Sequence, residues 1–310
     1  MVSLFVHRIS SESNLVNGSS SNPHMVKQLI NLLKLRIGII MSITAVVALA
    51  VTPGQPVTAW EVTILALTVL IAAGGAGAFN QYYETDLDIK MKRTQGRPFI
   101  NGDFQHNRLW LLLISGLVLA GVAGAGFALN GMAALFIFLG AFFYAIVYTV
   151  LLKRRTWLNI VIGGASGSFA VLAGAAVVDP SNIGPIPALL AVVLFLWTPS
   201  HFWSLAIAQH DDYAAAGVPM LPVVVGDKTA AKAVLANTLA LVSISILPFF
   251  FGLGWIYLFG AVTGGGYFIY RNIQLINDTS RKVAMTSFFA SLVQLCLLLI
   301  CAVLDVSLLG

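Results

Sequence analysis

Long runs of apolar residues, separated by short polar segments, make up most of the chain. Nine of these runs are close to the about 20 residues that a helix needs to cross a bilayer. A backbone in lipid must satisfy its own hydrogen bonds, and the alternating pattern of a β-barrel is absent, so we interpret the runs as helices. We therefore expect an all-α, polytopic membrane protein built as a bundle of nine transmembrane helices. The runs are 37–52, 60–83, 109–129, 131–151, 158–178, 187–209, 231–251, 254–271 and 284–306.

Composition agrees with this pattern because charge is scarce. Hydrophobic residues make up 58% of the 310 residues and charged residues 9%, whereas a soluble domain is roughly 25% charged. A chain this poor in charge cannot cover a surface that faces water, which argues against a soluble enzyme, a disordered chain and a nucleic-acid-binding domain. Small residues are frequent within the runs, as in residues 71–78, and predict close helix packing.

Basic residues mark one side of the predicted bundle. All 17 Lys and Arg lie in the N-terminal segment or in alternate loops, and the opposite loops contain only Glu61, Asp179 and Asp305. By the positive-inside rule, the N-terminus is cytoplasmic and the C-terminus lies outside. The net charge of +5 thus reflects topology, and we expect no nucleic-acid partner. We expect residues 1–30, which have no signal-peptide pattern, to form a flexible cytoplasmic tail, and residues 31–310 to form one intramembrane domain.

The first candidate for chemistry is an acidic group at the cytoplasmic end of the second run. Asn80, Glu84 and Asp88 are spaced four apart, and four residues advance about 400° around a helix, so the three side chains share one face. Oxygen ligands of this kind suit Mg²⁺, which typically binds one or two carboxylates together with substrate phosphates. A solvated loop would explain the neighbouring bases but not the amide and acids that continue the face of an apolar helix.

Basic residues follow this group directly. Lys90, Arg93 and Arg97 lie within ten residues of Asp88, and Arg makes paired contacts to phosphate oxygens. Carboxylates followed by guanidinium groups suggest a diphosphate that is held through Mg²⁺. The alternative for each single base is a solvated side chain that only obeys the positive-inside rule.

A second polar group lies at the end of the sixth run, on the same predicted membrane face. His201 and Asp212 are eleven residues apart, so a continuous helix would place them within about 20° of each other. Together with Asp211, they could help to hold a second ion on the same diphosphate. The alternatives are a histidine that is hydrogen-bonded within the bundle, and aspartates that balance nearby bases.

These residues also resemble a known family, the UbiA-type intramembrane prenyltransferases, and within it the haem O synthase branch (protohaem IX farnesyltransferases). The run Asn80…Glu84…Asp88…Arg93-Thr94…Arg97-Pro98 is similar to the first aspartate-rich motif of the whole family. Three further stretches resemble the narrower branch. They are Tyr148-Thr149 to Gly163-Gly164, Thr198-Pro199 to His201-Phe202-Trp203, and Asp212-Tyr213 to Leu221-Pro222.

The resemblance implies transfer of a farnesyl group from farnesyl diphosphate to a vinyl group of haem b, which gives haem O for haem–copper oxidases. It implies Mg²⁺ as cofactor and an active site on the cytoplasmic side of a bacterial inner membrane. The catalytic residues that it implies are Asn80, Glu84, Asp88, His201 and Asp212. The implied metal ligands are Asn80, Glu84, Asp88, Asp211 and Asp212. The implied diphosphate-binding residues are Lys34, Arg36, Lys90, Arg93, Arg97, Lys153 and Arg154.

Partners and alternatives complete the expectations. We expect farnesyl diphosphate and haem b as substrates, the lipid bilayer as solvent, and contacts with a haem A synthase or with oxidase assembly proteins. Departures from the branch pattern, such as Ser200 in Thr198-Pro199-Ser200-His201, leave open a related prenyltransferase with an aromatic or quinone-precursor acceptor. A membrane transporter is the alternative of another class, and its charges would lie near the bilayer midplane instead of at one face.

Overall fold

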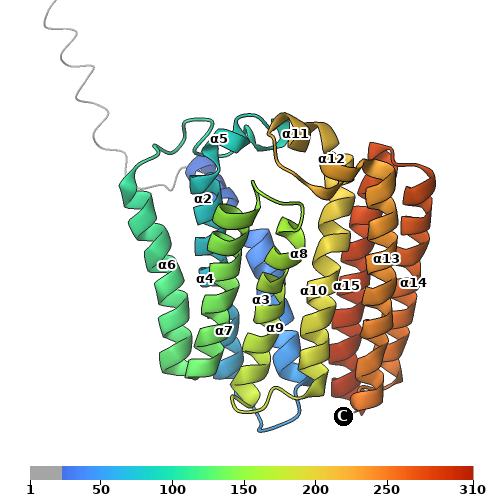
Figure 1. Cartoon of the computed structure of the whole chain (residues 1–310). Helices are drawn as coiled ribbons and strands as arrows, with labels where there is room; N and C mark the ends of the chain where they lie inside the picture. Colours follow the sequence, from blue (N-terminus) through green and yellow to red (C-terminus); the bar gives the residue numbers. More distant parts are fainter. Residues whose placement is uncertain (1–22, 310) are drawn as a thin grey trace, which may run out of the picture.

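The computed structural model describes residues 23–309, and every regular element in that range is a helix (Figure 1). The predicted all-α, polytopic class is therefore confirmed. The long helices are α3 (Leu35–Val51), α4 (Ala59–Tyr83), α6 (Arg108–Ala128), α7 (Gly131–Phe142) with the π-helix η2 (Phe143–Leu152), α9 (Ala165–Val178), α10 (Pro185–Ala208), α13 (Asp227–Ile246), α14 (Trp255–Asn277) and α15 (Arg281–Leu309).

Short elements connect the long helices. They are α2 (Pro23–Leu32), α5 (Thr85–Asp88), the 3₁₀ turns η1 (Lys92–Thr94) and η3 (Leu247–Phe251), α8 (Asn159–Gly163), α11 (His210–Ala215) and α12 (Leu221–Val225). Within the predicted tail, residues 23–30 form most of α2, and residues 1–22 lie outside the described range. The expectations that residues 1–30 form a tail and that 31–310 form one domain stay predictions.

Seven helices among the described residues are long and apolar enough to span a membrane, and the bent pair α2 and α3 can count as an eighth. Each of the nine predicted runs forms helix, but α14, which contains the predicted run 254–271, does not meet this criterion. The glycines at 264–266 and the polar pair Arg271 and Asn272 lower its mean hydropathy. The count of nine spans and the orientation of the termini stay predictions.

The helices form a bundle, and four of the short connecting helices gather at one end of it. Neighbouring pairs include α3 with α4 and α9, α4 with α6, α10 with α13, and α14 with α15. In Figure 1, α2, α5, α11 and α12 lie at one end of the bundle, and the C-terminus lies at the other. Two segments that are far apart in the sequence, residues 80–97 and 209–222, therefore meet at the same end.

At the opposite end, a buried carboxylate joins the last two helices. Asp305 of α15 is 3% exposed and accepts hydrogen bonds from the backbone N–H groups of Gly254 (2.5 Å), Ile256 (3.0 Å) and Tyr257 (3.2 Å). These groups belong to the N-cap residue and the first turn of α14, where backbone donors have no partner within the helix. A carboxylate at this position also interacts favourably with the helix dipole.

We expect Asp305→Ala to lower the free energy of unfolding by about 2–3 kcal/mol, because hydrogen bonds to a charged group are worth more than neutral ones. The measurement is thermal unfolding of the purified protein in one detergent. Asp179→Ala is the matched control, since Asp179 accepts hydrogen bonds from the N–H groups of Ser181 and Asn182 in an exposed turn. Equal losses in the two variants would contradict the role assigned to Asp305.

Candidate active site

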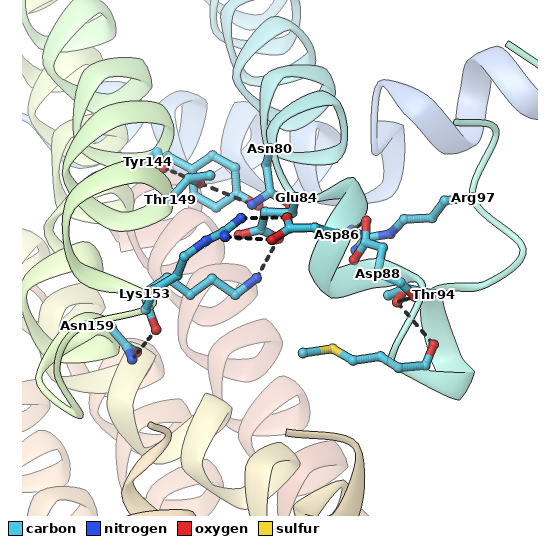
Figure 2. A network of polar contacts seen from close by, with 12 residues as sticks. Asn80, Glu84, Asp86, Asp88, Thr94, Arg97, Tyr144, Thr149, Lys153 and Asn159 are labelled. Carbon is cyan, nitrogen blue, oxygen red and sulfur yellow. Dashed lines mark hydrogen bonds and ion pairs between the residues drawn. The ribbon is translucent and has the colours of Figure 1, made fainter. Parts of the chain in front are cut away.

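The first acidic group lies where α4 gives way to α5. α4 ends at Tyr83 and Glu84 leaves helical geometry (φ −97°, ψ 18°), so the prediction of one continuous helix through Asn80, Glu84 and Asp88 is wrong. The hydrogen bonds still continue across the break, from Glu84 N–H to the Asn80 carbonyl (3.1 Å) and from Asp88 N–H to the Glu84 carbonyl (2.9 Å). The three side chains therefore remain neighbours at one end of the bundle (Figure 2).

Glu84 forms a buried ion pair. Its Oε2 accepts a hydrogen bond from Lys153 Nζ at 2.5 Å, and the Glu84 side chain is fully shielded from solvent. The other oxygen, Oε1, is also buried and has no hydrogen-bond partner among the described residues. A buried carboxylate oxygen without a donor is costly, and such an atom is a natural ligand for a cation.

Asn80 is held by two polar side chains. Its Oδ1 accepts from Lys34 Nζ (2.6 Å), and its Nδ2 donates to Thr149 Oγ1 (3.0 Å). Lys34 Nζ also donates to the hydroxyl of Tyr144 (2.9 Å). Since Nδ2 is directed to Thr149, the amide oxygen of Asn80 faces the cationic side of the site.

The π-helix η2 explains how these partners reach Asn80. Its backbone bonds span five residues, as between the Lys153 N–H and the Tyr148 carbonyl (2.9 Å), and Thr149 Oγ1 donates to the Tyr144 carbonyl, also five residues back (2.9 Å). The wider turn places Tyr144, Thr149 and Lys153 beside the end of α4. π-helical turns are rare and occur frequently at functional sites.

Asp88 is the third member of the row of side chains formed by Asn80, Glu84 and Asp88. Its Oδ2 accepts from Arg97 Nη1 at 2.5 Å, and its carbonyl accepts from Thr94 Oγ1 (2.9 Å), which fixes the turn that returns Arg97 to the site. Burial raises the pKa of the Asp88 carboxyl, and the Arg97 guanidinium opposes this rise. Asn80, Glu84 and Asp88 thus each have one oxygen bound to a cationic side chain.

The second polar group differs more from the prediction. α10 ends at Ala208, and Gln209 leaves helical geometry (φ −119°), so the expected helical stripe from His201 to Asp212 is wrong. Asp212 Oδ2 nevertheless accepts a hydrogen bond from the backbone N–H of Arg93 (3.4 Å), which links the two acidic segments. Asp211 is exposed.

His201 points into the bundle. Its Nδ1 is 2.6 Å from Ser291 Oγ, and its ring stacks between Trp197 (4.2 Å between centroids) and Phe288 (4.3 Å). This is the alternative of a histidine that is hydrogen-bonded within the bundle. A catalytic role for His201 stays a prediction.

The predicted diphosphate-binding bases fall into two groups. Lys34, Arg97 and Lys153 reach the row of Asn80, Glu84 and Asp88. The side chains of four others are exposed, namely Arg36, Lys90, Arg93 and Arg154. Arg154 donates two hydrogen bonds to Asp86 (both 2.7 Å), and this pairing lowers the pKa of the Asp86 carboxyl.

Sequence reasoning missed two supporting residues. Thr149 binds Asn80, and Asn159 Nδ2 donates to the carbonyl of Thr156 (2.7 Å) in the turn that follows Lys153. Both belong to the stretch that resembles the haem O synthase branch, and this resemblance was the only signal for them. Their supporting roles depend on contacts between helices.

A divalent metal fits this site through its donor types. Within the described residues, no group of three or more His, Cys, Asp or Glu side chains is arranged to hold a metal ion. The row instead offers two carboxylates and an amide oxygen, including the unpartnered Glu84 Oε1. That small set matches Mg²⁺, whose remaining ligands are usually substrate phosphates and water.

Comparisons with known proteins agree on family and fold. Residues 41–293 match the UbiA prenyltransferase family. The chain is 53% identical to "Protoheme IX farnesyltransferase 2" of Paramagnetospirillum magneticum, covering 92% of this chain and 99% of that protein. It is 46% identical to "Protoheme IX farnesyltransferase 1" of the same organism, covering 90% and 98%. A UbiA homologue of Archaeoglobus fulgidus, bound to DMAPP and Mg²⁺, has a similar fold with a TM-score of 0.67 at 14% identity, covering 91% of this chain and 100% of that one.

Proposed function

The chain belongs to the UbiA prenyltransferase family, and we propose that it transfers the farnesyl group of farnesyl diphosphate to a vinyl group of haem b to make haem O. The observation that carries the proposal is the 53% identity, over nearly the full length of both chains, to a protein named protoheme IX farnesyltransferase. The site has the chemistry for this reaction, with three cationic side chains and three oxygen-bearing side chains at one end of an apolar bundle.

Asn80, Glu84 and Asp88 would hold Mg²⁺, with Asp212 as a further ligand from the second segment. When bound, the metal would supply positive charge beside the oxygens of the leaving diphosphate. The structure with Mg²⁺ and DMAPP of the Archaeoglobus fulgidus homologue supports a divalent metal in this fold. Before substrate arrives, Arg97 and Lys153 balance the charges of Asp88 and Glu84.

The chain's own bases would stabilise the departing charge. As the allylic C–O bond breaks, negative charge grows on the diphosphate, and the ammonium and guanidinium groups of Lys34, Arg97 and Lys153 are already in position to meet it. Such preorganised charge is worth most where water is excluded. The farnesyl carbon then bonds to the haem vinyl group, and water adds to the cation that remains, losing a proton.

We place the active site on the cytoplasmic side of a bacterial inner membrane. All basic loops lie at that side by the positive-inside rule, and α5, which follows Glu84 and ends at Asp88, lies at the same end of the bundle as α11. Contacts with a haem A synthase or with oxidase assembly proteins are part of the same proposal, since haem O must pass to a later enzyme.

Membranes that contain the protein are expected to convert haem b and farnesyl diphosphate to haem O only when Mg²⁺ is present. The assay detects the hydroxyethylfarnesyl product by mass, with and without EDTA, and restores Mg²⁺ afterwards. Membranes without the protein are the control. Full conversion in EDTA would contradict the metal assignment, and cleavage of farnesyl diphosphate without haem O would indicate another acceptor.

A further inference from the structure

α2 has three distinct faces. At about 100° per residue, Gln28 and Leu32 fall together on the arc that packs on the protein, where both are buried. An adjoining exposed face, which we call the apolar arc, is formed by apolar side chains. The side chains of Lys27 and Asn31 form the third face, roughly opposite the apolar arc, which we call the polar arc. The members of the apolar arc are Met25, Val26, Leu29 and Ile30, which expose between 38% and 46% of their surface.

The apolar arc continues onto a transmembrane helix. α2 and α3 are bent by 50° at a short break, and α3 exposes Ile37, Ile40 and Ile43 toward the surroundings of the bundle. The exposed surface of a transmembrane segment faces lipid. An apolar arc that continues this surface at the end of the span, with polar residues opposite it, is typical of a helix that lies in the membrane interface.

The break between the two helices is held in one geometry by α4. Gln81 Nε2 donates to the carbonyls of Asn31 (2.8 Å) and Leu32 (3.3 Å) at the end of α2, and the Asn31 carbonyl also accepts from the backbone N–H of Lys34 (3.1 Å). Gln28 Nε2 donates to Asp103 Oδ2 (2.5 Å), which ties the middle of α2 to the loop after η1. α2 is therefore attached to the residue that directly follows Asn80.

Lys34 occupies the break itself. It adopts a left-handed conformation (φ 48°, ψ 42°), the only described residue other than glycine with positive φ, and such a conformation persists only where the surroundings enforce it. From this backbone its Nζ reaches Asn80 Oδ1 and the Tyr144 hydroxyl. Gly77 of α4 leaves room for its stem, since a Cβ there would lie 3.3 Å from Lys34 Cβ.

We propose that α2 is an interfacial helix whose apolar arc is buried among the lipids of the cytoplasmic surface, and that this anchoring fixes the left-handed turn that directs Lys34 into the site. Lys34 is then the residue that acts on substrate, and α2 positions it. The membrane contact is independent of the reaction, whereas the effect on Lys34 rests on the proposed function.

Lipid contact is tested by labelling in reconstituted vesicles. In full-length protein with Cys296→Ala and Cys301→Ala, the single substitutions Val26→Cys and Ile30→Cys report the apolar arc, and Lys27→Cys and Asn31→Cys report the polar arc. We expect bimane labels at 26 and 30 to be quenched by brominated acyl chains, and labels at 27 and 31 by iodide. Equal quenching by iodide at all four positions would overturn the proposal. So would protection from both quenchers at 26 and 30, because protein would then cover the arc.

The coupling to Lys34 is tested by adding one carboxylate to either face. Ile30→Asp is expected to raise the KM for farnesyl diphosphate about tenfold, as when one charge-assisted hydrogen bond is weakened, and to lower kcat as well, because Lys34 also stabilises the charge that grows on the diphosphate. Asn31→Asp, the matched control, adds the same charge in the same turn on the polar arc and is expected to leave KM unchanged.

The combination with Lys34→Ala separates positioning from a general structural effect. If α2 acts through Lys34, Ile30→Asp adds no further increase in KM once Lys34 is removed. Additive effects of the two substitutions would overturn the coupling. If farnesyl diphosphate is not the substrate, wild-type and variants alike show no turnover with it, while the quenching result still decides the lipid contact.

Discussion

Glu84→Gln is expected to lower kcat for haem O formation by about 10²–10³-fold, the loss found when one group that stabilises transition-state charge is removed. The substitution keeps the size of the side chain but removes the carboxylate that carries the free oxygen Oε1 and pairs with Lys153. The measurement is kcat in detergent-solubilised protein at saturating Mg²⁺ and both substrates. Activity within a few-fold of wild type would contradict a catalytic role for Glu84.

Stability must be separated from catalysis in this experiment. Glu84→Gln leaves the buried Lys153 without a counter-charge, and breaking a buried pair costs about 3–5 kcal/mol. Lys153→Met and the double variant complete a cycle. We expect the double variant to be more stable than either single variant but still inactive, which assigns the lost activity to chemistry. Asp86→Asn, at an exposed carboxylate two residues away, is the matched control and is expected to keep most of the activity.

The membrane fold can be predicted from the sequence because lipid leaves a backbone few choices. An apolar run that must satisfy its own hydrogen bonds becomes a helix, and each of the nine runs does so. The sequence is less informative about helix ends. Neither Tyr83-Glu84 nor Ala208-Gln209 contains glycine or proline, so local rules predict continuous helices where the structure has breaks.

In the candidate site too, the sequence indicates the residue types but not the contacts between helices. Residue types and four-residue spacing predict that Asn80, Glu84 and Asp88 act as a group, and the structure places the three side chains close together. Their cationic partners come from far along the chain, Lys34 from 46 residues before Asn80 and Lys153 from 69 residues after Glu84. Only helix packing, and the unforeseen π-helix η2, brings them together. Likewise, the packing of His201 depends on Ser291, 90 residues away, which no local pattern indicates.

Gly174→Ala is expected to prevent assembly of the bundle or to lower its melting temperature strongly. α9 crosses α3 at this glycine so closely that an added Cβ would collide with the carbonyl group of Ala45 and approach the backbone nitrogen of Leu49. Backbone atoms cannot rotate away as a side chain would, so the two helices must separate. Overpacking in a dense core usually costs about 1–3 kcal/mol, and a rigid backbone contact places this site at or above the upper end.

Gly167→Ala makes the same change two turns earlier in α9 and isolates the cause. A Cβ at Gly167 meets nothing within 4 Å, so this variant is expected to have the melting temperature of the wild type. Unfolding is followed by size exclusion after heating, or by the reactivity of the buried Cys301 thiol as it becomes exposed. Because α3 also begins at the turn that holds Lys34, a partly folded Gly174→Ala protein is expected to lose diphosphate binding as well as stability. If Gly174→Ala and Gly167→Ala had the same melting temperature, close packing of α3 on α9 would not be what stabilises this part of the bundle.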